Sequence, residues 1–324
     1  MPDQQASKAG PVQAAADTSS DDEKVQGFIF DIKQFAVHDG PGIRTTVLFK
    51  GCPLRCLWCH NPEGASEEPQ LFYDPAKCIG CGHCVAVCVR GAHSFEDGHH
   101  LIDRNLCEQC GACAEGCYAH ALELAGRQVS VAGVLEEVLR DRPFFERSGG
   151  GVTLSGGEPT AQYEFARALL KAVKAQGIHT ALDTAGFVVW KRLEGLLAHT
   201  DLVLYDLKQM NSEQHRRLTG VPNELILANL RRIDNAGYPV WVRIPLIPGQ
   251  NDDDANLHAV GRFLADLKCV ERVDILRYHA FAESKYEQLG LEYPLAGLRS
   301  PSNEHARSRQ EILVNYGLHH VTVS

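Results

Sequence analysis

The chain has 324 residues, of which 44% are hydrophobic and 23% charged, and its formal net charge is −9 at pH 7. This length suits one large domain with a small insert, and an acidic balance without a long basic block argues against nucleic-acid binding. Because no apolar run could cross a bilayer or serve as a signal peptide, we expect a cytoplasmic protein without a membrane partner.

Residues 1–24 are rich in Ala, Ser, Asp and Gln and contain a single Val. A segment of this composition cannot bury enough apolar surface to become ordered, so we predict a disordered tail. The rest of the chain divides into residues 25–70 and 126–324, which are expected to form the main domain, and residues 71–125, which are expected to form an insert.

Eleven of the 12 cysteines fall into three tight clusters, and Cys269 stands alone as an expected small buried hydrophobe. Disulfides are not expected in a chain without a secretory signal. Cysteines two residues apart are also poorly placed to join distant parts of a fold. Metal ligation in a reducing compartment is therefore the favoured interpretation.

The first cluster consists of Cys52, Cys56 and Cys59, which follow a predicted strand at 45–49 with the spacing C-x3-C-x2-C. A tight loop with these gaps can direct three sulfurs at one point. Three thiolates leave one iron of a four-iron cluster open to another ligand, and an open position is typical of a catalytic metal. For this motif alone, a zinc site completed by a distant fourth ligand remains the alternative.

The insert contains the other eight clustered cysteines in an internal repeat with an offset of 107 − 78 = 29 residues. Each run has the bacterial ferredoxin spacing C-x2-C-x2-C-x3-C, in which the fourth cysteine ligates the other cluster. The spacing predicts two [4Fe–4S] clusters, with zinc as a weaker alternative. The predicted ligands are Cys78, Cys81, Cys84 and Cys117 for one cluster, and Cys107, Cys110, Cys113 and Cys88 for the other.

The insert departs from the ferredoxin pattern after the fourth cysteine of each run, and it also contains several histidines. Val89 and Tyr118 stand where ferredoxins usually place Pro after the fourth cysteine. Cysteines already fill the predicted ligand positions, so the histidines are expected at the surface: His83, His93, His99 and His100. The insert is expected to relay electrons or to contact a partner.

Outside the insert, short β-branched runs alternate with helical segments. The predicted strands are 45–49, 151–154, 180–183, 202–206, 240–245, 273–278 and 320–323. The predicted helices are 131–140, 161–176, 191–199, 224–236, 255–267 and 304–316. This alternation predicts an α/β barrel or a doubly wound sheet, and in both the chemistry lies at the carboxyl ends of the strands.

Polar residues do gather at these predicted strand ends, at 155–158, 183–184, 206–208 and 278–279. In the first of them, Ser-Gly-Gly-Glu, the two glycines allow a close backbone approach, and Glu158 can accept a hydrogen bond from an ammonium group. A Gly-Gly-Glu turn taken alone is most often only a loop.

The cysteine spacing resembles the signature of the radical S-adenosylmethionine (SAM) superfamily, and longer segments resemble the glycyl-radical-enzyme activating enzymes, the family of pyruvate formate-lyase activase. These segments are Asp39-Gly-Pro-Gly-Ile-Arg44, 51–61, 148–158, 182–187, 206–210, 242–249 and Tyr278-His279. Pyruvate formate-lyase activase itself lacks the insert, so the likeness is to the activases of dehydratases, decarboxylases and C–N or C–S lyases. The resemblance implies a partial β/α barrel of about six strands with an inserted dicluster ferredoxin domain.

The resemblance also implies the reaction. SAM would chelate the open iron, and one electron would break a C–S bond to give methionine and a 5′-deoxyadenosyl radical. That radical would take a Cα hydrogen from a glycine of a partner glycyl radical enzyme. The implied cofactors are three [4Fe–4S] clusters, SAM and a monovalent cation. Flavodoxin or ferredoxin is the implied reductant, in an anaerobic setting.

Individual roles follow from the matching positions. Trp58 and His60 would line the adenine and the cluster edge, and Trp58 would also shield the cluster from water. Gly157 and Glu158 would meet the methionyl end of SAM. The resemblance assigns the other positions as follows: Asp183, Thr184 and Asp206 to a cation site, Lys208, Arg243 and His279 to the SAM pocket, and Asp39 to contact with the substrate's glycine loop.

Simpler interpretations stay open for some of these residues. Asp206 and Lys208 could be a solvated pair, and His279 could be a core histidine. Two other functions also stay open. One is radical chemistry on a small molecule or a maturing peptide, and the other is pure electron transfer through the insert.

Overall fold

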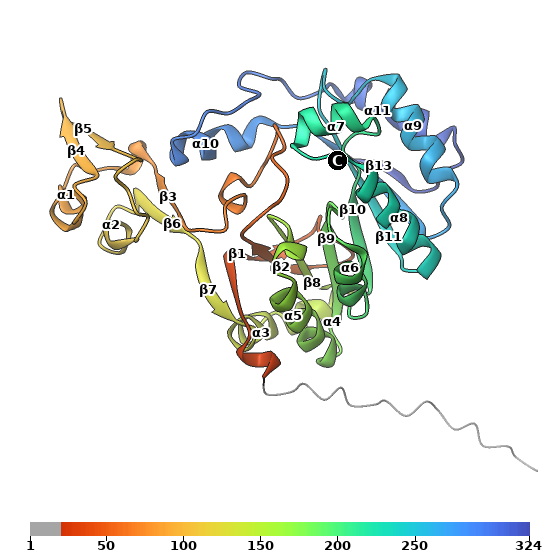
Figure 1. The fold of residues 1–324 in the computed structure, drawn as a ribbon, viewed down its shortest axis with the longest axis horizontal. Coiled ribbons are helices and arrows are strands. Elements are labelled where there is room, and N and C mark those ends of the chain that lie inside the picture. Colours follow the sequence, from red (N-terminus) through yellow and green to blue (C-terminus); the bar gives the residue numbers. More distant parts are fainter. Residues whose placement is uncertain (1–20) are drawn as a thin grey trace, which may run out of the picture.

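The computed structural model describes residues 21–324, so most of the predicted tail, residues 1–20, lies outside the described residues (Figure 1). The last part of the predicted tail is structured instead. Asp22–Lys24 forms a short 3-10 helix, η1. The Asp22 carboxylate accepts a hydrogen bond of 2.7 Å from Lys171, and this pairing attaches the segment to the main domain.

A nine-stranded sheet forms the main domain, with the order β13-β12-β11-β10-β9-β8-β2-β1-β7. Seven neighbouring strands are parallel: β2 (Arg44–Phe49), β8 (Gly151–Gly156), β9 (His179–Thr184), β10 (Leu202–Asp206), β11 (Val240–Leu246), β12 (Val270–Arg277) and β13 (Val321–Val323). The two strands at the other edge are antiparallel, β1 (Gln26–Ala36) and β7 (Arg127–Ser130). The sheet does not close on itself, which confirms the expected partial barrel.

Helices cover one face of the sheet (Figure 1). The longer ones are α3 (Val131–Leu139), α5 (Tyr163–Ala175), α6 (Trp190–Leu197), α8 (Glu224–Ala236), α9 (Asp254–Ala265) and α11 (Asn303–Val314). Shorter helices are α4 (Arg142–Ser148), α7 (Ser212–Thr219) and α10 (Glu283–Leu289). No helix among residues 21–324 is both long and apolar enough to span a membrane.

The two faces of the sheet carry different side chains because successive residues of a strand point to opposite sides. Val152 and Leu154 of β8, like Val203 and Tyr205 of β10, are fully buried in the core shared with the helices. The residues between them face the concave side, where Ala181, Leu202, Leu204 and Trp241 form a small separate apolar cluster.

The insert is a separate small unit between β2 and β8. Its ends pair as antiparallel strands, β3 (Gln70–Tyr73) and β6 (Leu122–Ala125). Inside it lie α1 (His83–Val87), β4 (His93–Glu96), β5 (His99–Ile102) and α2 (Ala112–Glu115). The insert has its own core of Leu71, Cys84, Cys113 and Leu122. Arg104 joins the insert to α10 by donating 2.9 Å to the Gln288 carbonyl.

Candidate functional site

The three-cysteine loop leaves the carboxyl end of β2 and is fixed by backbone hydrogen bonds at two places. Arg55 N donates 2.7 Å to the Thr219 carbonyl and Leu57 N donates 3.0 Å to the Leu218 carbonyl, both at the end of α7. Near its start, Cys52 N donates 3.2 Å to the Ala65 carbonyl. The loop is therefore fixed at its start and at its centre.

All three thiols of this loop are shielded from water. Burial raises the pKa of Cys52 to about 12 and the pKa values of Cys56 and Cys59 to about 11. Thiols in this environment stay protonated at neutral pH unless a metal ion binds them, because the metal stabilises the thiolate. The loop therefore has the chemistry of a metal site and not that of a nucleophile.

The Gly-Gly-Glu turn at the end of β8 packs directly on the start of the cysteine loop. Gly157 N donates 2.7 Å to the Phe49 carbonyl, and Glu158 N donates 2.8 Å to the Gly51 carbonyl. A Cβ atom on Gly157 would overlap the carbonyl oxygens of Gly51 and Gly64. Glycine is needed here because two backbone segments meet, so the close approach is to the cysteine loop itself.

Glu158 is placed differently from the expectation that it meets the methionyl end of SAM. It is only 1% exposed, and both carboxylate oxygens are engaged within the protein. Thr184 Oγ1 donates 2.8 Å and Thr160 N 3.1 Å to one oxygen, and Ala185 N donates 2.9 Å to the other. Burial raises the pKa of Glu158, although these donors oppose the shift. Glu158 therefore ties the ends of β8 and β9 together.

A polar network crosses the concave face at the strand ends. Arg243 on β11 lies 3.0 Å from the Asp183 carboxylate on β9 and 3.8 Å from the Asp39 carboxylate. Asp183 also accepts a hydrogen bond of 2.6 Å from Ser155, and Asp39 accepts one of 2.7 Å from Thr46. This network brings Asp183 and Arg243, which were expected at strand ends, together with Asp39 from the loop before β2.

The buried charges of this network affect one another. Burial raises the pKa of Asp183, with Arg243 opposing the shift. Burial alone would lower the pKa of Arg243, but the neighbouring Asp183, Asp206 and Asp39 carboxylates raise it above the usual value. Arg243 therefore remains a fixed cation.

Asp206 and Lys208 are not a solvated surface pair. Lys208 Nζ lies 2.7 Å from Asp206 Oδ2, and the Lys208 side chain is only 10% exposed. Burial would lower the pKa of Lys208, but Asp206 raises it, and the Cys56 and Cys52 thiols add to that effect. The ammonium group is therefore a fixed positive charge beside the cysteine loop.

The expected cation site of Asp183, Thr184 and Asp206 is not assembled in this structure. Thr184 follows Asp183 on the same strand, so its side chain points to the other face, where it bonds Glu158. Asp183 and Asp206 already face Arg243 and Lys208, respectively. Protein cations therefore stand where a monovalent cation was expected.

An aromatic wall lies on the other side of the cysteine loop. The rings of His60 and His279 lie 4.1 Å apart between centroids, and Phe281 lies 4.3 Å from His279. Burial lowers the pKa of His279 and lowers that of His60 to about 4, so both rings are neutral at pH 7. The Nδ1 atom of His279 is buried without a hydrogen-bond partner among residues 21–324, so this histidine retains an unused polar atom at the site.

Trp58 lies behind this wall in a compact apolar group. It is 6% exposed and packs with Leu218, Ile247, Tyr278 and Tyr286. Cys56 and Leu57 of the cysteine loop pack against the same group, so the indole lies beside this loop.

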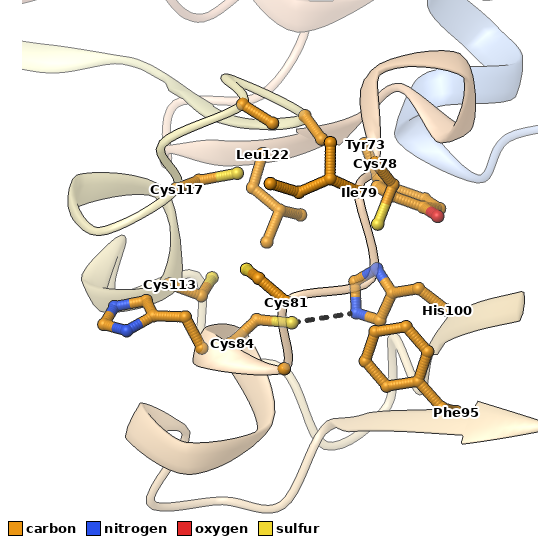
Figure 2. Close-up of a pocket in the computed structure, with 14 residues that line it drawn as sticks. Tyr73, Cys78, Ile79, Cys81, Cys84, Phe95, His100, Cys113, Cys117 and Leu122 are labelled. Atoms are coloured by element: carbon orange, nitrogen blue, oxygen red, sulfur yellow. Dashed lines mark hydrogen bonds between the residues drawn. The ribbon is translucent and has the colours of Figure 1, made fainter. Parts of the chain in front are cut away.

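Cysteines from both runs of the insert line one cavity (Figure 2). Its lining includes Cys78, Cys81 and Cys84 from the first run together with Cys113 and Cys117 from the second. The four predicted ligands of one cluster, Cys78, Cys81, Cys84 and Cys117, thus share this cavity with Cys113, which the spacing assigns to the other cluster. Val89 and Tyr118, which replace the usual prolines, are 91% and 85% exposed.

Four insert histidines were expected at the surface, and for two of them that expectation is wrong. His93 and His100 are 5% and 6% exposed, whereas His99 is exposed. Burial lowers the pKa of both buried imidazoles. The alternation in 93–102 and its Asp97-Gly98 turn are a hairpin signal, from which this burial could have been predicted.

Arg44 and Lys50 are buried cations near the site whose roles the sequence analysis did not identify. Arg44 donates to Thr153 Oγ1 at 2.6 Å and to the Val152 carbonyl at 2.6 Å, and burial lowers its pKa to about 10. Lys50 donates 2.5 Å to the Glu63 carbonyl, and burial lowers its pKa to about 8. They fix the loop that carries Asp39 and the segment after the cysteine loop.

Comparison with known proteins gives consistent matches. Residues 108–259 match the radical SAM superfamily and residues 70–118 match the 4Fe-4S dicluster domain. Over 286 residues the chain is 43% identical to an isethionate sulfite-lyase activating enzyme from Oleidesulfovibrio alaskensis. This alignment covers 86% of this chain and 92% of that protein.

Two further relatives are named as activating enzymes of other enzymes. The chain is 42% identical over 278 residues to a choline trimethylamine-lyase activating enzyme from the same organism, which covers 84% of this chain and 90% of that protein. It is 36% identical over 307 residues to a 4-hydroxyphenylacetate decarboxylase activating enzyme from Clostridioides difficile, which covers 92% and 96%, respectively. Each alignment spans most of both chains.

Proposed function

The chain belongs to the radical SAM activating enzymes of glycyl radical enzymes, and from this membership we propose that it installs a radical on a glycine of a partner enzyme. The observation that carries the proposal is one loop with three partly buried cysteines, packed against strand ends that supply a fixed ammonium and a fixed guanidinium. Activating-enzyme relatives of this length and identity support the same reaction class.

The residues present fit an iron–sulfur cluster with SAM beside it. Cys52, Cys56 and Cys59 would hold three irons, and their buried thiols need a metal to become thiolates. When bound, the cluster would supply the electron that cleaves the C–S bond of SAM. Three protein ligands would leave one iron free to bind SAM.

The surrounding side chains would bind and orient SAM. Lys208, held by Asp206 next to the cysteine loop, would neutralise the SAM carboxylate. The neutral rings of His60 and His279 would form a wall for the adenine. Gly157 and Glu158 would act indirectly, by holding the cysteine loop against β8 and β9.

Asp39 and Arg243 would lie where the glycine loop of the partner enzyme enters the site. The Asp39 side chain is 21% exposed and is fixed by Thr46 and Arg243, so one part of its carboxylate remains open to a peptide. A glycine loop suits this position because its Cα has no side chain in the way. The hydrogen atom leaves glycine Cα for the 5′ carbon of deoxyadenosine, and the unpaired electron stays on the glycine.

Three further assignments complete the proposal. The eight cysteines of the insert would hold two more [4Fe–4S] clusters, which makes three in all. Flavodoxin or ferredoxin would supply the electron. The cysteine set needs a reducing compartment, so we place the protein in the cytoplasm.

The test uses the anaerobically reduced holoenzyme with SAM and three purified target enzymes: an isethionate sulfite-lyase, a choline trimethylamine-lyase and a 4-hydroxyphenylacetate decarboxylase. We expect a glycyl EPR doublet on at least one target, with a matching amount of 5′-deoxyadenosine. A variant target with Ala in place of the radical glycine serves as the control and should give no doublet. Target-dependent SAM cleavage without any glycyl signal would contradict the proposal and would indicate a different substrate.

A further inference from the structure

A buried histidine pair in the insert touches a predicted cluster ligand, and the proposed function leaves this pair unused. Resting on the proposed cluster assignment, we propose that His100 donates an N–H···S hydrogen bond to the Cys84 thiolate and thereby raises the reduction potential of the cluster held by Cys78, Cys81, Cys84 and Cys117. His100 is thus a positioning and tuning residue for electron transfer and not a cluster ligand.

The hairpin β4–β5 places His100 in the lining of the cavity, with His93 next to it. His93 lies opposite Ile102, and Phe95 lies opposite His100. Residues opposite one another project from the same face of the ladder. These four side chains are at least half-buried, whereas His99 and Leu101 on the other face are exposed. Figure 2 shows His100 and Phe95 beside Cys84 and Cys81.

The contact distances single out one nitrogen of His100. Its Nε2 atom lies 3.4 Å from Cys84 Sγ and 2.9 Å from His93 Nδ1. Its other nitrogen, Nδ1, is buried and has no hydrogen-bond partner in the described part of the chain. One nitrogen therefore makes every polar contact of the ring.

This arrangement selects a tautomer. If His100 carried its proton on Nδ1, a buried N–H would have no acceptor, which costs about 1–3 kcal/mol. With the proton on Nε2, the N–H has two acceptors, Cys84 Sγ and His93 Nδ1. A thiolate is an ionised acceptor, and hydrogen bonds to ionised groups are about twice as strong as neutral ones. The proton is therefore expected on Nε2, directed toward Cys84.

Neighbouring rings hold the imidazole in this orientation. The His100 ring meets the Tyr73 ring edge-on with centroids 4.6 Å apart, and it stacks on His93 at 5.0 Å. Phe95 lies 5.2 Å away on a third contact. Because packing already fixes the ring, the side chain loses little conformational entropy when it forms the hydrogen bond. We therefore expect the bond in both the oxidised and the reduced cluster.

The effect on the cluster has a definite sign. Reduction adds one negative charge, and an N–H···S bond stabilises the more negative state more strongly, so the bond raises the potential. The 29-residue repeat maps Cys84 onto Cys113 and His93 onto the apolar Leu122. Among the insert cysteines in the described residues 21–324, Cys84 is the one whose sulfur lies within hydrogen-bond distance of a side-chain nitrogen. Removing His100 should therefore move the potential of one cluster only.

The experiment measures potentials in a background that lacks the catalytic cluster, with Cys52→Ala, Cys56→Ala and Cys59→Ala combined. Anaerobic redox titration followed by EPR should resolve the two insert clusters. His100→Leu should weaken the electron affinity of one cluster about tenfold, a shift of about 59 mV to more negative potential for a one-electron couple. His100→Gln, which keeps an N–H donor, should shift it less, and His99→Leu is the matched control and should shift neither.

Iron analysis separates the ways this proposal can fail. About eight irons in the background protein confirm two clusters, and fewer would contradict the cluster assignment on which the inference rests. Full iron with both potentials unmoved in His100→Leu would overturn the role of His100 alone. Loss of one cluster's iron in both His100 variants would also overturn it, because His100 would then be needed for assembly.

Discussion

At the scale of single residues, Arg243 joins two separate parts of the site. It lies between carboxylates on β9 and in the loop before β2, and only 14% of its side chain is exposed. Removing one partner of a buried ion pair leaves an uncompensated charge, at a cost of about 3–5 kcal/mol. Exposed ion pairs contribute about 0–1 kcal/mol.

We therefore expect Arg243→Met to lower the free energy of unfolding by about 3–5 kcal/mol and to abolish SAM cleavage. Arg140→Met is the matched control, because Arg140 pairs with Glu136 on the surface. Adding Asp183→Asn to Arg243→Met should recover part of the stability, since the orphaned carboxylate is removed. Urea unfolding of the wild type, the two single variants and the double variant gives the free energies of unfolding. If Arg243→Met loses no more stability than Arg140→Met, the network does not stabilise the fold.

The positions of Asp183, Thr184 and Glu158 could not be predicted from local sequence. Asp183 and Thr184 are adjacent at a strand end, and the motif suggested one shared site for both. The two-residue period of a strand sends them to opposite faces. Glu158 was expected to face a ligand because the turn is rich in glycine, but its acceptors are filled by the backbone and side chain of the next strand. Such partners lie 26 residues or more away in sequence, so local spacing could not reveal them.

At the scale of elements, the turn after β8 couples the parallel sheet to the cysteine loop. The turn and the loop meet backbone to backbone at Gly157, where no side chain fits. The geometry of the cysteine loop should therefore depend on the absence of a side chain at Gly157.

Gly157→Ala is expected to displace the cysteine loop and to lower the iron content by about one cubane's worth while the insert clusters remain. Gly133→Ala is a matched control, because Gly133 lies in α3 and an added Cβ there meets only Ser130 Oγ at 3.4 Å. Iron analysis and EPR of both variants provide the measurement. Full iron and unchanged SAM cleavage in Gly157→Ala would mean that the contact is not required.

The helix α7 supports the cysteine loop from the other side, and His215 supports the end of that helix. His215 is 1% exposed, and its Nδ1–H donates 2.6 Å to the Val221 carbonyl. Burial lowers the pKa of His215, with that hydrogen bond opposing the shift. Acid should therefore weaken this support.

The sign follows from proton linkage. The unfolded chain binds a proton near the ordinary histidine pKa of about 6.5, and the folded state resists it, so stability falls as pH drops below about 6.5. His215→Gln should be less stable at neutral pH, because the hydrogen bond is altered, but should show a shallower loss between pH 7 and 5. Urea unfolding at several pH values measures this, and parallel slopes for the two proteins would contradict it.

The strands were easier to predict than the short elements for a physical reason. The six central parallel strands are buried runs of β-branched and aliphatic residues, and that pattern is visible in sequence. By contrast, β1 carries exposed charges at Asp31 and Lys33, because it lies toward the edge of the sheet and is half solvated. Helices such as α7 and α10 are short, and their positions are set by tertiary contacts, so their sequence patterns were too brief to recognise.

At the scale of the whole molecule, the chain combines a catalytic domain and a ferredoxin-like insert that meet at few points. Lys50 reaches from the end of β2 to the Ala125 carbonyl at the base of the insert, and Arg104 joins the insert to α10. Because the insert has its own core, its clusters should assemble independently of the catalytic loop.

Cys59→Ala tests this independence together with the catalytic assignment. We expect it to abolish SAM cleavage and to remove about four of about twelve irons, leaving both insert clusters. Cys269→Ala is the matched control, since Cys269 packs against the main core far from either motif in sequence. Retained SAM cleavage in Cys59→Ala would instead favour a protein that only transfers electrons through its insert.

The central claim is that a hydrogen atom passes from a glycine Cα of the partner to SAM-derived deoxyadenosine. The most direct measurement uses a partner enzyme grown with glycine deuterated at Cα, incubated with the reduced holoenzyme and SAM, followed by mass spectrometry of the 5′-deoxyadenosine. The account predicts one deuterium in each molecule formed in the partner's presence. Partner-dependent deoxyadenosine that carries no deuterium would contradict it.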